Sequence, residues 1–147
     1  MATETTDSRK SVWYYLPAVA RVVMGLIFFI FGLNGFLHFI PQPKMPEAPG
    51  AFIGALVRSG YMIPLLAGTQ TLVGALLLLN RFVPLALALI APVIVNIIAF
   101  HLFLAPEGMV MAILVLVLEL YLAWTYRGAF LSMLAPRARP GNRLQGG

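Results

Sequence analysis

The stretch that decides the fold is FVPLALALIAPVIVNIIAFHLFLAP, residues 82–106, which contains no charged side chain. A helix rises about 1.5 Å per residue and the hydrocarbon core of a bilayer is about 30 Å thick, so about 20 apolar residues can cross it. This run therefore predicts a transmembrane helix. Three further apolar runs lie around it, at residues 22–43, 59–80 and 108–126, the last interrupted by Glu119.

The four runs predict an all-α membrane protein, a four-transmembrane-helix bundle in which short connections make neighbouring helices antiparallel. The expected spans are about 16–39, 61–80, 82–104 and 109–127. They form one transmembrane domain, residues 12–134, after a polar N-terminal segment, residues 1–11. Residues 135–147, rich in Arg, Pro and Gly, are expected to be a disordered basic tail.

The loop after the first span is longer than the others. It begins with PQPKMPEAP, residues 41–49, where four prolines predict an extended, non-helical stretch. Residues 51–59 follow, with Phe52 and Leu56 four residues apart on one face. This spacing predicts a short amphipathic helix at the outer membrane interface.

The composition supports a membrane protein. The 147 residues are 61% hydrophobic and 10% charged, and the mean hydropathy is +0.91. These values exclude an ordinary soluble domain and a disordered chain. The chain has no cysteine, which excludes disulfides, iron–sulfur clusters, cysteine zinc sites and covalently attached haem.

The basic residues indicate topology and not nucleic-acid binding, although the net charge is +5 and the pI is near 10.1. Arg9, Lys10, Arg81 and the C-terminal arginines lie on one predicted side, against only Lys44 and Arg58 on the other. Because cytoplasmic loops carry an excess of Lys and Arg, both termini are expected to be cytoplasmic.

Polar side chains inside apolar spans need a partner or a purpose. Two are charged, Arg21 and Glu119. Arg21 either extends to the cytoplasmic headgroups or pairs with Glu119, which lies about 6 Å deeper. The other polar residues of the spans are uncharged, and they are the candidate ligand-binding residues: Asn34, His38, Gln70, Asn96 and His101.

Helical phase tests whether these residues can act together. Asn34 and His38 are four residues apart and share a face, whereas Asn96 and His101 are five apart, about 140° around an ideal helix. Either His101 therefore faces another interface, or the helix is distorted after Pro92.

The chemistry of the two histidines leaves several interpretations open. His38 and His101 fall at similar heights near the outer surface and can simply be interfacial, without any ligand. Imidazole and amide groups also suit the carbonyl oxygens of a quinone. A b-type haem is disfavoured because there is one pair, close to the interface, and two ligands are too few for zinc. No catalytic constellation is found, so enzymatic activity stays open.

Several segments resemble the bacterial DoxX and DoxX-like family: RVVMGLIFFIFGLNG from Arg21, the outer-loop helix, QTLVGALLLLNRFVPL from Gln70, and NIIAFHLF from Asn96. The resemblance runs from about Leu16 to Leu134. It implies a small four-helix protein of the bacterial inner membrane, and some family members are named after a subunit of thiosulfate:quinone oxidoreductase. Many members have glutamate where this chain has Gln70, which argues against proton handling there.

The resulting hypothesis is a DoxX-like inner-membrane component of a quinone-linked redox assembly. The alternative is a non-enzymatic membrane scaffold or assembly factor. The expected partners are the lipid bilayer and redox proteins, and a homo-oligomer is also left open.

Overall fold

The structure is a computed structural model that describes residues 4–137, and within this part of the chain all regular secondary structure is helical. The elements are α1 (Glu4–Leu37), α2 (Glu47–Arg58), α3 (Met62–Leu78), α4 (Val83–Phe103), the short 3₁₀ helix η1 (Pro106–Gly108), α5 (Met109–Thr125) and α6 (Arg127–Leu131). The all-helical class expected from the sequence is thus confirmed. Most of the predicted basic tail lies outside the described residues.

Three helical segments are long and apolar enough to cross a membrane: Val12–Leu37, Val83–Phe103 and Pro106–Thr125. A fourth is counted only if α2 and α3 are taken together, and these two helices meet at a bend of 91°. The structure therefore gives three to four candidate spans. This indicates a multi-pass membrane protein that contacts the lipid bilayer.

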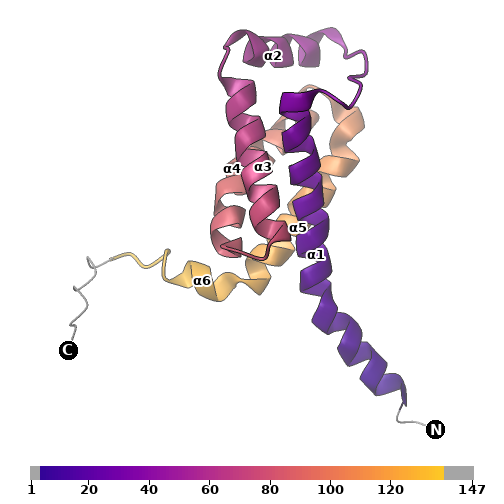
Figure 1. Ribbon diagram of the computed structural model, residues 1–147, viewed down its shortest axis with the longest axis vertical. Helices are drawn as coiled ribbons and strands as arrows, with labels where there is room; N and C mark the ends of the chain where they lie inside the picture. Colours follow the sequence, from indigo (N-terminus) through magenta and orange to yellow (C-terminus); the bar gives the residue numbers. More distant parts are fainter. Residues whose placement is uncertain (1–3, 138–147) are drawn as a thin grey trace.

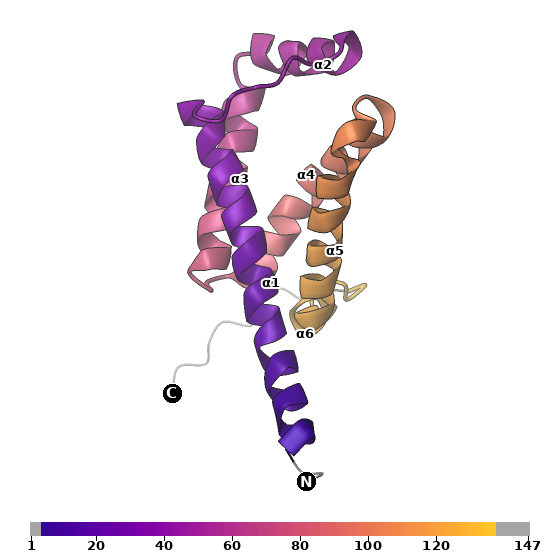
Figure 2. The same ribbon diagram turned by 90° about the vertical axis from the view of Figure 1, so that its right-hand side faces the viewer.

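The long helices pack along one another in pairs. α1 lies along α3, and α4 lies beside α5. The two pairs are joined by contacts between α3 and α4 and between α1 and α5. α2 lies across one end of the molecule, while α6 and the beginning of α1 lie at the other end (Figures 1 and 2). We call these the α2 end and the α6 end.

The contact between α1 and α3 is close because glycines replace side chains on both helices. A Cβ atom on Gly32 would overlap the backbone nitrogen of Thr71, and one on Gly74 would lie 2.6 Å from the Cα atom of Phe29. Gly25 and Gly35 also face α3. Small residues that let two backbones approach are typical of helix packing within membranes.

Two sets of hydrogen bonds stabilise the C-terminal end of α3. Asn80, with φ at +54°, reverses the chain, and the Arg81 N–H donates to the carbonyl of Leu76 at 2.9 Å. The guanidinium of Arg21 on α1 then donates to the carbonyl oxygens of Leu77 and Leu78. A cation at a helix C-terminus satisfies unpaired carbonyls and opposes the helix dipole.

The start of α2 corrects the prediction that residues 41–49 are entirely non-helical. The helix begins at Glu47, so Pro49 lies within its first turn. The N–H groups of a first turn have no partner inside the helix, and a proline there breaks no hydrogen bond.

The buried core lies towards the α6 end. Its most completely buried side chains come from α1, α3, α4 and α5: Met24, Leu77, Leu87, Ile90, Ile94 and Leu122. Towards the α2 end the helices are less tightly packed, and a cavity replaces the core.

Candidate functional site

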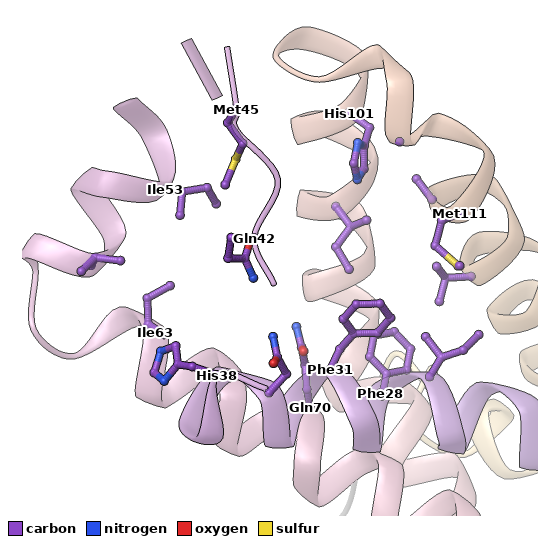
Figure 3. A pocket seen from close by; sticks show the side chains of 18 residues that line it. Phe28, Phe31, His38, Gln42, Met45, Ile53, Ile63, Gln70, His101 and Met111 are labelled. Carbon is purple, nitrogen blue, oxygen red and sulfur yellow. The ribbon is translucent and has the colours of Figure 1, made fainter. Parts of the chain in front are cut away.

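The candidate site is a cavity of about 730 Å³ near the α2 end. Phe28 comes from α1, Ile53 from α2, Gln70 from α3, His101 from α4 and Met111 from α5, so every long helix contributes to its wall (Figure 3). Most of the lining is apolar. The size is within the range of about 300–1,000 Å³ that is usual for small-molecule sites.

Five polar side chains face this cavity, and none of them is an acid, a lysine or an arginine: Asn34, His38, Gln42, Gln70 and His101. Amides and neutral imidazoles can each donate and accept hydrogen bonds. The cavity therefore suits a largely apolar, uncharged ligand that carries a carbonyl or hydroxyl group.

Asn34 is held by the end of its own helix. It is 7% exposed, and its Oδ1 atom accepts a hydrogen bond from the Ile40 N–H at 2.7 Å. The His38 N–H donates to the Asn34 carbonyl oxygen at 2.9 Å, and His38 itself has φ of +51°. These bonds turn the chain away from α1 and engage the oxygen of the Asn34 side chain, which leaves its amide nitrogen for the cavity.

His101 is fixed at the hairpin between α4 and α5. Its Nδ1 atom donates to the Ala105 carbonyl oxygen at 2.8 Å, because a carbonyl can only accept. In the neutral ring the Nε2 atom is then an acceptor. A Cβ atom on Gly108 would overlap this ring, so the hairpin closes around the histidine only with glycine at position 108.

Gln70 is directed differently from its two neighbours on α3. The hydroxyls of Thr69 and Thr71 donate to the carbonyl oxygens one turn earlier in the same helix, at 2.9 and 2.8 Å. Gln70 instead lines the cavity, and Figure 3 shows its side chain directed inwards. The amide at this position is thus available to a ligand.

The two histidines share the cavity but lie well apart in it. Figure 3 shows His38 on the side of Ile63 and His101 near the side of Met111. Among residues 4–137, no three His, Cys, Asp or Glu residues come close enough to hold a metal ion.

Asn96 is not brought to the cavity. It is exposed on α4, whereas Ile97 and His101 of the same helix line the cavity wall. Four of the five uncharged residues singled out in the sequence therefore meet at one cavity, and the fifth lies on the outer surface of the helices.

The two intramembrane charges also lie apart from the cavity lining. Arg21 binds the end of α3, as described above, and not Glu119. Glu119 is 7% exposed, and its Oε2 atom has no hydrogen-bond partner within the described part of the chain.

The segment between α1 and α2 supplies residues that the sequence did not single out. Gln42 and Met45 line the cavity from this segment, and Figure 3 shows Gln42 reaching in from it. Gln42 stands between Pro41 and Pro43 in a stretch expected to be an exposed loop. The one available signal was an uncharged polar residue in a loop followed by an amphipathic helix.

α2 covers the cavity through aromatic packing. The ring centroids of Phe52 on α2 and Phe100 on α4 are 5.6 Å apart. The ring of Phe100 also lies edge-on to the ring of His101, with the two centroids 5.2 Å apart. The side chains of Ile53 and Val57 line the cavity from the same helix.

Comparison of the chain with protein-family models, curated proteins and solved structures found no match.

Proposed function

We propose that this chain is a DoxX-like integral protein of the bacterial inner membrane that binds a quinone as a small component of a redox assembly. The observation that carries this proposal is the cavity near the α2 end, which is mostly apolar and contains uncharged hydrogen-bonding groups from α1, α3 and α4. In this proposal the chain binds and orients the quinone, and a partner protein exchanges electrons with it.

The lining supports a quinone better than a charged ligand. A charged ligand would lose its hydration without meeting an opposite charge, which is strongly unfavourable. A quinone carbonyl needs a donor, and the amide nitrogens of Asn34, Gln42 and Gln70 can each supply one. Phe28, Phe31 and other apolar side chains of the same wall suit an isoprenoid tail.

The membrane arrangement belongs to the same proposal. α1, α3, α4 and α5 each cross the bilayer as a four-helix bundle, and α2 lies as an amphipathic helix at the outer interface. Arg81 and Arg127 follow α3 and α5 at the α6 end, which supports a cytoplasmic position for that end and for both termini. The cavity would then open near the outer leaflet.

The test is quinone binding to the purified full-length chain. The protein is purified from its native membrane, its lipid extract is analysed by mass spectrometry, and ubiquinone or menaquinone is titrated into protein in nanodiscs. Gln70→Leu and Ile97→Trp should lower quinone occupancy at least tenfold, because the first removes a donor and the second fills the cavity.

Thr69→Val is the matched control, since Thr69 neighbours Gln70 but bonds to its own helix. It should bind quinone as the unaltered chain does. Neither co-purified quinone nor binding of added quinone would refute the proposed ligand.

A second candidate, a non-enzymatic scaffold or assembly factor, is supported by a different observation. Three of the polar groups inside the helices hydrogen-bond to backbone groups and so hold helix ends: Arg21, Asn34 and His101. Stable protein partners in the native membrane, together with an absence of quinone and no effect of Gln70→Leu on assembly of the complex, would favour this function.

A further inference from the structure

The exposed amide of Asn96 lies on the side of α4 opposite the core. Ile94, two residues earlier, is 1% exposed, and two residues correspond to about 160° around a helix. Asn96 therefore points away from the other helices. It stands about 20 Å along α4 from Val83, well inside a hydrocarbon layer about 30 Å thick.

An amide in this position has no partner in the lipid. No hydrogen bond connects the Asn96 side chain with another of residues 4–137, and lipid tails offer neither donors nor acceptors. A polar side chain within a transmembrane segment normally faces another helix or a water-filled cavity. Something other than lipid is therefore expected to cover it.

The residues around Asn96 form a regular stripe along the outer face of α4. Leu89, Asn96 and Phe103 are spaced by seven residues, and so are Leu85, Pro92 and Ala99. Leu85 is 52% exposed, Leu89 42% and Phe103 78%. A helix face with this spacing can lie along a second helix at a small crossing angle. We call these six residues the α4 stripe.

The hydrogen-bonding groups of Asn96 favour a second copy of the same chain as the partner that covers the α4 stripe. An amide carries a donor and an acceptor, and a two-fold axis brings the same surface of two protomers together. Each Asn96 amide can then donate to the other and accept from it. The stripe contains no charged residue that would repel a second copy.

We propose that this protein forms a two-fold symmetric dimer in the membrane through the α4 stripe, with the two Asn96 side chains hydrogen-bonded across the axis. The interface is separate from the cavity, which Ile97 and His101 line from other sides of α4, about 100° and 140° around the helix from Asn96. The dimer does not depend on the proposed quinone binding.

The test uses the full-length chain in liposomes, with dimerisation measured by single-molecule photobleaching over a range of protein-to-lipid ratios. Asn96→Leu should weaken dimerisation about tenfold or more, whereas Asn96→Gln, which keeps the amide, should restore most of it. Because Asn96 is exposed and Leu suits a lipid-facing position, the Leu variant should fold normally, and its thermal stability in detergent checks this.

Cross-linking tests the geometry directly, since the chain contains no cysteine. Asn96→Cys and Leu89→Cys should form disulfide-linked dimers on oxidation. Val95→Cys is the matched control, because Val95 is 66% exposed at the same depth but points about 100° away. A monomeric chain at every protein-to-lipid ratio, equal dimerisation of the Asn96→Leu variant, or capture of a different protein by Asn96 in place of a second copy would overturn the proposal.

Discussion

The Nδ1 atom of His101 lies 2.8 Å from the carbonyl oxygen of Ala105, which stands four residues before Met109, the first residue of α5. The carbonyl fixes the neutral ring in the form that carries its proton on Nδ1. The Nε2 atom is left as an acceptor at the cavity wall. A ligand hydroxyl, such as that of a quinol, can donate to it.

This relationship predicts the tautomer of His101. In nitrogen-15 NMR spectra of histidine-labelled protein at a pH where the ring is neutral, the Nδ1 atom of His101 should carry the proton. His101→Ala identifies the signal, and His38, whose side chain has no hydrogen bond to a described residue, is the internal comparison. A neutral His101 protonated on Nε2 would contradict the hydrogen bond to Ala105.

Gly108→Ala should destabilise the hairpin between α4 and α5. The added methyl group would overlap the His101 ring, and displacing a packed ring costs about 1–3 kcal/mol of folding free energy. Gly128→Ala is the control, since nothing lies within 4 Å of the position of its Cβ atom. Thermal unfolding in detergent measures both, and equal stability of the two variants would contradict the close packing of His101 on Gly108.

Gly74→Ala should separate α1 from α3. The new Cβ atom would lie 2.6 Å from the Cα atom of Phe29, which belongs to backbone and cannot rotate away. We expect a loss of about 1–3 kcal/mol in folding free energy, measured by unfolding in mixed detergent micelles. Gly68→Ala, on the same helix, would meet only the far end of the Phe36 ring at 3.9 Å and should leave stability unchanged or slightly raised.

Arg21 and Glu119 should contribute to stability independently. Arg21 donates to the carbonyls of Leu77 and Leu78, and not to Glu119. Arg21→Met should therefore destabilise the end of α3, whereas Glu119→Gln, which removes a buried carboxyl group without a partner for Oε2, should be tolerated. In a double-mutant cycle the two effects should add to within about 0.5 kcal/mol. A coupling of several times that size would indicate an ion pair.

The helical class could be predicted because hydrocarbon leaves a spanning backbone few alternatives. Residues 82–106 are apolar throughout, and in lipid their N–H and carbonyl groups must bond to one another, which a helix achieves. The continuation of α1 back to Glu4 was not predicted, because a polar segment gives no hydropathy signal. The 91° bend between α2 and α3 falls at Gly60, whose φ is +78°; a glycine after an apolar helix indicates where the helix ends, but not the angle at which the next one leaves.

The members of the cavity could be predicted only in part. A spacing of five residues showed that Asn96 and His101 cannot point the same way on an ideal helix, but not which of them faces inwards. That choice depends on the rotation of α4 about the core, where Ile90 and Ile94 are buried. Gln42 lies outside the apolar spans, where a polar side chain is ordinary and does not indicate a site.

The register of α1 against α3 is likewise a property of the folded molecule. The spacing of the glycines at positions 25, 32 and 35 places them near one face of α1, but it does not say which helix meets that face. Only the register brings the Arg21 guanidinium to the last turn of α3. Long polar side chains with several possible partners are therefore the hardest to place from sequence.

The unequal lengths of neighbouring helices have a consequence for the surrounding lipid. α3 has 17 residues and is about 26 Å long, whereas the apolar part of α1, Val12–Leu37, has 26 residues and is about 39 Å long. In the proposed four-span arrangement, a bilayer about 30 Å thick is thicker than α3 is long and thinner than the apolar part of α1 is long. We expect acyl chains to shorten beside α3 and α1 to tilt, so the protein should prefer thin, short-chain regions of its membrane.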